Sequence, residues 1–191
     1  MKMPWSLGPV LAATFLLNIA SGQAPTTSDG PSQFEATLNS FKTAPSIYSG
    51  GKGTTHLRID FNNSSISYEL SYSGLSSTVT QAHIHFSQKG VNGGIIVYLC
   101  DNTGVAAAGG VSVPACPTSG TVTGTITAAD VNPSTNPAPV TAVGIAEGDF
   151  AALVAAIQHQ AGYVNVHTTT YPSGEIRGQL EGLHSDAAGK Q

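Results

Sequence analysis

The chain has 191 residues, only 9% of them charged, and a formal net charge of -4 from 7 Lys and Arg against 11 Asp and Glu. A hydrophobic content of 40% is enough for a buried core and too high for a solvated disordered tail. The few basic residues form no run, which excludes the electrostatic footprint of a protein that binds nucleic acid or an anionic membrane. With 22 Gly and 11 Pro, the composition predicts one turn-rich domain.

The first 22 residues have the pattern of a secretory signal peptide. Lys2 gives a short positively charged start, the apolar run Leu7–Ala20 follows, and Ala20-Ser21-Gly22 fits the small-residue cleavage rule. The run is shorter than the about 20 residues that a membrane-spanning helix needs. We therefore expect residues 1–22 to be removed and the mature protein to be secreted or periplasmic, without a membrane span. The alternative is a buried N-terminal helix.

Two cysteines, Cys100 and Cys116, flank a loop rich in Gly, Ala and Pro. In an oxidising compartment a lone pair at this spacing most simply forms one disulfide. Closing a loop of this size stabilises a fold by about 3 kcal/mol in the chain-entropy model. We therefore expect a disulfide within a folded domain over residues 34–181, with a polar linker at residues 23–33 and a polar tail at residues 182–191.

Most of the domain shows the alternating apolar and polar residues of short β-strands, separated by turn residues. One segment instead has apolar residues at helical spacing, which predicts an amphipathic helix over Asp149–Gln160. Ala129–Thr141 is expected to be a loop, and the turn at Asn62 and Asn63 carries two N-x-S glycosylation sequons. Strands are expected at Phe34–Leu38, His56–Phe61, Ile66–Tyr72, Val79–Phe86, Ile95–Leu99, Gly120–Ile126, Tyr163–Thr168 and Glu175–Leu180.

Seven or eight short strands with turn chemistry between them predict an all-β fold. We expect an antiparallel, Greek-key-like sandwich or barrel, for example of the immunoglobulin-like type. The single predicted helix then acts as a short crossover packed on one edge or end.

The histidines carry the chemistry that the sequence offers. His83 and His85 form an H-x-H pair in an expected strand, so both imidazoles project from one face, about 6.6 Å apart along it. His167 lies in the last expected hairpin, and strand parity places it on the equivalent face with Asn165. If the two strands are neighbours, the three rings converge. If they are far apart in the sheet order, no shared ion is possible.

Three imidazoles from two strands indicate a metal site, because imidazole suits zinc and copper, and copper(II) binds more tightly at equal geometry. On this interpretation Glu175 or Asn165 orients a ring through its second nitrogen. Arg177 would lie beside the site and attract an anion such as superoxide, which is compatible with a redox or oxygen-species enzyme. Whether the chain is an enzyme stays open at this point.

The alternative is that the same histidines form hydrogen bonds to backbone and turn residues. The domain would then be a non-catalytic extracellular module, structural or binding a protein or carbohydrate partner. The other three histidines, His56, His159 and His184, are expected in solvent. Catalysis by side chains alone is not indicated, because the G-x-S-x-G, P-loop, H-E-x-x-H and G-x-G-x-x-G motifs are absent from the sequence.

One motif of the sequence is Gln81-Ala82-His83-Ile84-His85-Phe86. The other is Gly162-Tyr163-Val164-Asn165-Val166-His167-Thr168, followed by the return strand with Tyr171-Pro172-Ser173-Gly174-Glu175-Ile176-Arg177. These two histidine-bearing motifs resemble those of a known family, the CHRD domain, named from chordin. The resemblance covers about Phe34 to Glu181 and implies a secreted all-β domain. Through the likeness proposed between CHRD domains and Cu/Zn superoxide dismutase, the resemblance also implies a Cu/Zn superoxide dismutase-like sandwich. It makes His83 and His85 similar to the H-x-H copper ligands there.

Overall fold

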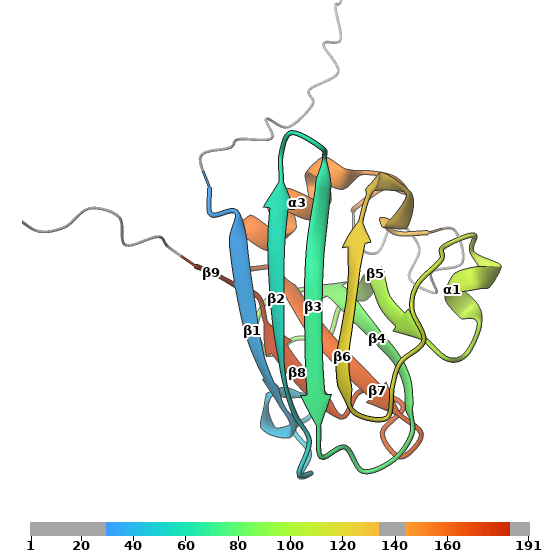
Figure 1. Cartoon of the computed structure of the whole chain (residues 1–191). Helices are drawn as coiled ribbons and strands as arrows, with labels where there is room; N and C mark the ends of the chain where they lie inside the picture. The colour runs from blue at the N-terminus through green and yellow to red at the C-terminus, as the bar shows by residue number, and fades with distance from the viewer. Residues whose placement is uncertain (1–29, 134–143, 184–191) are drawn as a thin grey trace, which may run out of the picture.

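The computed structural model describes residues 30–133 and 144–183, which fold mainly into β-strands (Figure 1). The helices in this part are α1 (Val105–Ala108) and α3 (Phe150–Gln158), with single 3-10 turns at Ser40–Lys42 and Ala128–Asp130. The strands are β1 (Gln33–Asn39), β2 (Lys52–Asp60), β3 (Ser65–Ser73), β4 (Val79–Phe86), β5 (Gly94–Asp101), β6 (Gly120–Ile126), β7 (Gly162–Thr168), β8 (Ile176–Gln179) and β9 (Glu181–Gly182). The predicted all-β class is confirmed.

Several predicted segments lie outside the described residues. These are the signal peptide, most of the linker, much of the loop at 129–141, and the tail beyond Leu183, including His184. The linker prediction also reached too far at its end, because Gln33 already pairs with Arg58 as the first residue of β1.

All paired strands are antiparallel, and their order across the sheet is β5-β4-β7-β8-β1-β2-β3-β6, with β9 beside the start of β1. Figure 1 shows β1, β2, β3 and β6 as one layer and β8, β7, β4 and β5 as the other. The Tyr68 hydroxyl on β3 donates to the Leu99 carbonyl on β5 (2.6 Å) and so links the two layers near the unpaired edges. The sheet is therefore a nearly closed barrel, as predicted, with Greek-key-like neighbours such as β4 and β7.

The core follows directly from strand alternation. Strands β1, β2 and β3 bury every second residue, and their inward residues include Leu38, Leu57 and Leu70. Helix α3, which lies near the upper end of the barrel in Figure 1, adds an apolar face to the same core. It begins after Asp149, whose side chain accepts a hydrogen bond from the Ala152 N–H. The predicted helix is confirmed, with slightly shorter ends.

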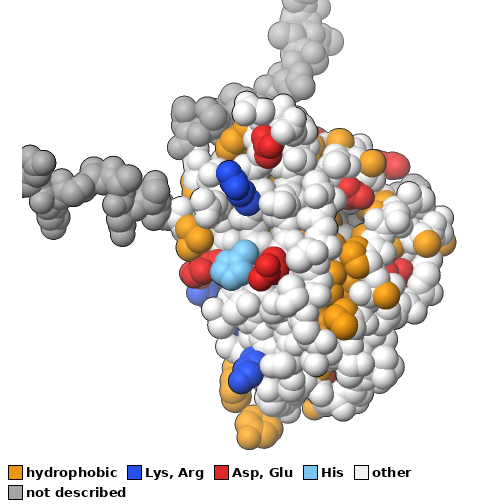
Figure 2. All heavy atoms as spheres, viewed as in Figure 1, with side chains coloured by type: hydrophobic (Ala, Val, Ile, Leu, Met, Phe, Trp, Pro, Cys, Tyr) orange, Lys and Arg blue, Asp and Glu red, His pale blue; other side chains and the backbone are white. Residues whose placement is uncertain are grey.

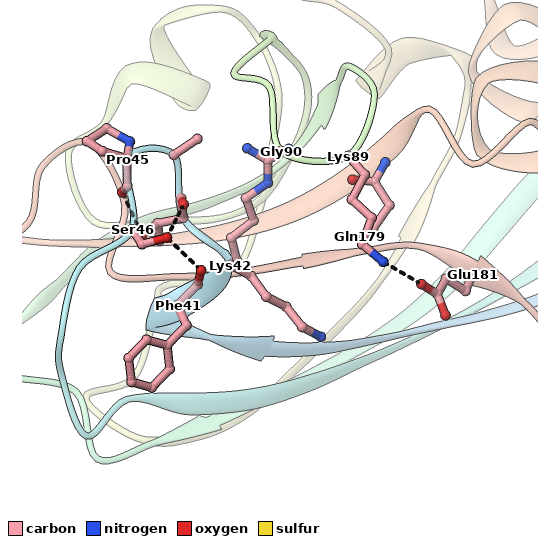
Figure 3. A pocket seen from close by; sticks show the side chains of 11 residues that line it. Phe41, Lys42, Pro45, Ser46, Lys89, Gly90, Gln179 and Glu181 are labelled. Carbon is pink, nitrogen blue, oxygen red and sulfur yellow. Dashed lines mark hydrogen bonds and ion pairs between the residues drawn. The ribbon is translucent and has the colours of Figure 1, made fainter.

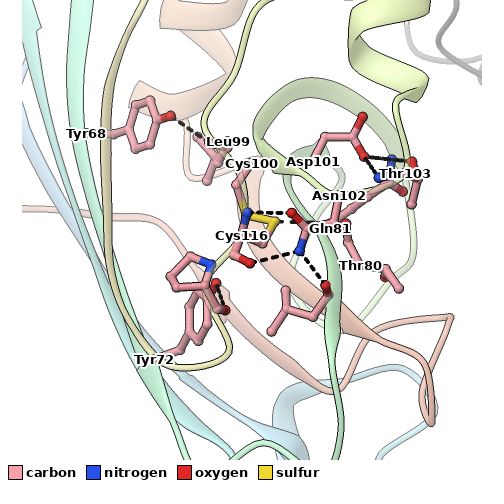
Figure 4. The surroundings of a disulfide bond; sticks show 12 residues. Tyr68, Tyr72, Thr80, Gln81, Leu99, Cys100, Asp101, Asn102, Thr103 and Cys116 are labelled. Carbon is pink, nitrogen blue, oxygen red and sulfur yellow. Dashed lines mark hydrogen bonds between the residues drawn. A yellow bond between two sulfur atoms is a disulfide. The ribbon is translucent and has the colours of Figure 1, made fainter.

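The predicted disulfide is present: Cys100 at the end of β5 is bonded to Cys116 in the loop before β6 (Figure 4). Asn102 holds the same loop, since its side-chain amide donates to the Cys116 carbonyl and accepts from the Cys116 N–H. The loop also contains α1, which the sequence did not predict. A single helical turn is too short for an apolar period, and it forms because the Asp101 carboxylate accepts from the Ala106 N–H.

The layer formed by β1, β2, β3 and β6 carries scattered polar and charged side chains on its outer face (Figure 2). His56 lies there on β2, exposed as predicted and flanked in register by Glu35 and Glu69. Within residues 30–133 and 144–183, no helix has the length and apolar character to cross a membrane.

Candidate metal centre

Strands β4 and β7 are neighbours in the sheet, which decides whether the three histidines meet. His83 lies opposite Asn165, and His85 lies opposite Tyr163, so the alternate residues of both strands share one face. The centroid of the His83 ring lies 5.4 Å from the centroid of the His85 ring and 4.8 Å from that of the His167 ring. One nitrogen from each ring forms a set in which all atoms lie within 4.8 Å of one another. The predicted convergence is confirmed.

This polar face is buried, in contrast to the outer faces of β1, β2 and β3. An antiparallel sheet commonly keeps one face in solvent, but β4 and β7 bury residues of both parities. His83 is 1% exposed and His85 is 7% exposed. Tyr98 of β5 packs edge-on against His83, with ring centroids 4.7 Å apart, and Tyr163 stacks on His85 at 4.8 Å. The rings therefore lie in an aromatic pocket.

Irregular pairing shapes this pocket. The register between β4 and β5 shifts twice, between Ala82 and His83 and again between Ile84 and His85. Each shift leaves one extra residue on β5, which is the signature of a β-bulge, and bulges often re-aim side chains beside functional sites. The two bulges therefore lie directly at the H-x-H pair.

Gly93 brings the segment after β4 back over His85. A Cβ atom on Gly93 would collide with the Phe86 carbonyl, so only glycine allows this close approach. The Gly93 carbonyl lies 3.0 Å from His85 Nδ1, and the Gly93 N–H donates to the Tyr163 hydroxyl (3.1 Å). The segment 87–93 thus fixes the orientation of the His85 ring.

Backbone carbonyls also fix the ring tautomers. His85 Nδ1 bonds the Gly93 carbonyl, and His167 Nδ1 bonds the Pro172 carbonyl at 2.9 Å. Because a carbonyl only accepts, both Nδ1 atoms carry the proton and each Nε2 atom keeps its lone pair. Metal-ligating histidines usually donate their other N–H in this way. The two rings are therefore set for ligation through Nε2.

The remaining ring nitrogens have no partner among the described residues. His85 Nε2, His167 Nε2 and both nitrogens of His83 are shielded from solvent and make no hydrogen bond. Leaving a buried polar atom unpaired costs about 1–3 kcal/mol, so such atoms are rare unless a ligand satisfies them. Each of the three rings has an unpaired nitrogen, and a ligand nitrogen of each ring lies within 4.8 Å of those of the other two, which together indicate a ligand.

The residues present fit a transition metal that prefers imidazole. Three nitrogens spaced evenly around one ion at about 2.0–2.1 Å lie about 3.5 Å apart. The ligand nitrogens of the three rings lie within 4.8 Å of one another, so each pair would have to close by up to about 1.3 Å. Burial lowers the pKa of His83 well below its usual value of 6.5, and it lowers that of His85 to about 3. Burial also lowers the pKa of His167. All three rings are therefore neutral near pH 7, as ligands must be.

Glu175 does not orient a histidine, which corrects the role expected for it. Its carboxylate is fully buried and accepts from the Ser76 N–H and hydroxyl (2.9 and 2.8 Å) and from the Thr168 hydroxyl (2.8 Å). Thr168 has the opposite strand parity to His167, so Glu175 bonds on the other face of the hairpin. The expected face was wrong because Glu175 precedes β8, where alternation does not yet apply.

Asn165 and Arg177 lie on the face of the triad, but each has another partner. The Asn165 amide donates to the Ser173 carbonyl (3.3 Å), and its oxygen is buried without a hydrogen bond. The Arg177 guanidinium lies 3.5 Å above the Tyr163 ring and donates to the Val91 carbonyl (2.8 Å). Arg177 therefore holds the segment 87–93 and is not directed at a free anion.

Sequence reasoning missed the groups that orient the rings, because they are backbone carbonyls of Gly93 and Pro172. The signals for them are the Gly93-Gly94 pair and the Pro172-Ser173-Gly174 turn, where glycine and proline mark a chain reversal. Gly174 has φ +111°, and the Asn165 side chain occupies the space of a Cβ there.

Comparison with known proteins places this barrel and its histidine face in a family. The family model of the CHRD domain matches residues 34–180. This match covers most of the chain, and the chain belongs to the CHRD domain family. No curated protein and no solved structure matches the sequence.

Proposed function

We propose that this chain is an exported metal-binding protein in which His83, His85 and His167 bind one copper or zinc ion. The observation that carries the proposal is a set of three clustered rings whose buried nitrogens include four without a hydrogen-bond partner. Carbonyls fix two of the rings in the tautomer that ligation requires. A histidine set that served only to pin the hairpin would be expected to use these nitrogens in hydrogen bonds.

Binding is the function that the geometry supports best. A bound copper or zinc ion would supply Lewis-acid chemistry there, and copper would also supply redox chemistry. The unpaired nitrogens are shielded from solvent, and Arg177 is committed to the segment 87–93. A redox enzyme needs a route for its substrate to the metal, so we place carriage or storage of the ion ahead of catalysis.

Export is part of the proposal. It is supported by the Cys100–Cys116 disulfide, which persists in oxidising compartments, and by the signal-peptide pattern of residues 1–22. We expect the mature N-terminus at Gln23. Intact mass of the protein from the exported fraction tests this, and finding only the uncleaved chain in the cytosolic fraction would overturn it.

Metal content of the protein from its native compartment tests the binding proposal. We expect about one equivalent of copper or zinc in the parent chain, and loss of that metal in His83→Gln and His167→Gln. His56→Gln is the matched control, because that ring is exposed on β2. A parent chain that is folded, metal-free and unable to take up either metal would show that the face is a hydrogen-bonded scaffold.

A second candidate function, binding of an extracellular carbohydrate or protein, is favoured by one other feature. A cleft of about 450 Å³ lies where the 41–46 segment faces Lys89 and Glu181 (Figure 3). Phe41 at this cleft is 64% exposed and lies edge-on to the exposed Tyr48, with ring centroids 6.0 Å apart. Exposed aromatic pairs are common at binding surfaces. If this surface binds, Phe41→Ser should abolish retention on an oligosaccharide panel without changing metal content.

A further inference from the structure

Resting on the proposed metal centre, we infer that the histidine triad selects a monovalent ion, Cu(I), over the divalent ions Zn(II) and Cu(II). Two properties of the site determine this preference: the charge around the three rings and the number of ligands that the ion can reach.

The ligand set carries no negative charge. Of the side chains that the structure describes, the group able to hold a metal consists of His83, His85 and His167, with no carboxylate or thiolate. The cost of moving an ion out of water rises with the square of its charge, so a divalent ion pays about four times the cost of a monovalent ion of equal size. Neutral imidazoles bind the ion through their lone pairs but add no negative charge to offset that extra cost, and the site therefore favours the lower charge.

The surroundings add positive charge. Tyr163 stacks on His85 with an interplanar angle of 6°, and the Arg177 guanidinium lies 3.5 Å above the same Tyr163 ring. Tyr163 is on β7, between the strands that carry His85 and Arg177, so a buried cation lies one ring away from the triad. Glu175, the acidic residue of this hairpin, bonds Ser76 and Thr168 instead. A second positive charge on the metal would therefore be repelled.

The number of ligands favours the same ion. Zinc sites in proteins almost always have four ligands, and a three-residue zinc site completes its shell with water. Here Tyr98 and Tyr163 pack against the rings, and the unpaired nitrogens are shielded from solvent. Cu(I), with a filled d shell and low charge, is stable with three nitrogen donors and no water. The closed triad meets the needs of Cu(I) without a fourth ligand.

Competition between ions on the full mature chain tests the inference. We would titrate the metal-free protein with Cu(I) under anaerobic conditions against a chromophoric Cu(I) chelator, and separately with Zn(II) and Cu(II) against chelators of known affinity. We expect the dissociation constant for Cu(I) to be at least about 100-fold below that for Zn(II). His83→Gln should lose this binding, and His56→Gln should keep it.

A charge variant supplies a second, independent readout. Asn165 lies directly opposite His83 and has the shape of aspartate, so Asn165→Asp adds one negative charge beside the triad. The ratio of Zn(II) to Cu(I) affinity should rise at least about tenfold, because the added charge offsets the second charge of zinc. Asn62→Asp on the exposed β2–β3 turn is the matched control and should leave the ratio unchanged.

The possible results distinguish the choice of Cu(I) from the existence of the metal centre. Zn(II) or Cu(II) bound by the triad as tightly as Cu(I), or a ratio unmoved by Asn165→Asp in a folded variant, would overturn the choice of Cu(I) and leave the metal centre in place. No binding of any of the three ions would overturn the metal centre itself.

Discussion

His83 of β4 and His167 of β7 meet edge to face across a strand pair, with ring centroids 4.8 Å apart and an interplanar angle of 63°. Both rings are neutral, and each presents a nitrogen without a hydrogen bond. In the metal-free protein this contact is unfavourable, because buried polar atoms have lost water without gaining a partner. The same contact supplies two of the three ligands that the proposed ion needs.

The metal-free protein should lose stability as the pH falls below about 6.5. Burial lowers the pKa of His83 well below 6.5 and lowers that of His85 to about 3. At a pH below 6.5 but above these lowered pKa values, the unfolded chain binds more protons than the folded chain. The free energy of unfolding should therefore fall with falling pH, by up to about 1.4 kcal/mol per pH unit for each ring. Urea unfolding with a chelator, from pH 7.5 to 5, measures this slope.

His83→Gln is the control for that slope, because it removes one titrating ring from the buried set. Its slope should be smaller by up to about 1.4 kcal/mol per pH unit, while His56→Gln should match the parent. Equal stability at pH 7.5 and pH 5 in the parent would contradict the buried, neutral state of the rings.

Glu175→Gln should lower stability without changing metal affinity. The substitution weakens charge-assisted hydrogen bonds from Ser76 and Thr168, each of which contributes about 1.5–3 kcal/mol when one partner is charged. We expect a loss of about 1–3 kcal/mol in the free energy of unfolding. A change in metal affinity larger than tenfold in the folded variant would return Glu175 to the site.

Arg177→Met should loosen the segment 87–93. The buried guanidinium donates to the Val91 carbonyl, the Gln88 carbonyl and the Asn92 side chain. Its loss removes these three hydrogen bonds to β8 and leaves the bond from Gln179 to the Ser87 carbonyl. Amide hydrogen exchange at Ser87 and Gly93 should accelerate. The exchange rates of the amides in β1, β2, β3 and β6 should stay unchanged. Arg58→Met on the exposed face of β2 is the control, and equal exchange in both variants would show that Arg177 does not hold the segment.

Removing the disulfide should cost about 3 kcal/mol, because Cys100 and Cys116 close a loop with a sequence separation of 16. The double variant Cys100→Ala with Cys116→Ala, compared with the parent in urea unfolding, measures this. Cys116→Ala alone is unsuitable, because it leaves a free thiol. A loss below about 0.5 kcal/mol would show that the hydrogen bonds of the loop, including those of Asn102 and Tyr72, hold it without the disulfide.

Local patterns were enough to predict strands β1 to β8 and helix α3, but not α1 or β9. Leu57 and Ile59 alternate with exposed residues because β2 has one wet face, and the apolar period near Leu153 exists because α3 buries one side. Strand parity also placed His83 and His85 on one face of their strand and His167 on the equivalent face of the last hairpin. Strand parity does not determine the order of strands in the sheet. That β4 and β7 are neighbours is therefore known only from the structure.

Nonlocal contacts explain what the sequence did not predict. The burial of the histidine face depends on the segment 87–93, which folds back over it at Gly93. This is a close contact between backbone segments, and no alternation of apolar and polar residues reveals it. The bulges on β5 change register without any special residue. Glu175 lies just before β8, so alternation assigned it to the wrong face.

Anomalous diffraction from crystals of the copper-loaded protein tests the central claim most directly. The account predicts one copper peak between His83, His85 and His167, with Nε2 of His85 and of His167 and one nitrogen of His83 at about 2.0–2.1 Å. Copper bound elsewhere, such as at the exposed His56 or His159, with the three buried rings unchanged, would contradict it.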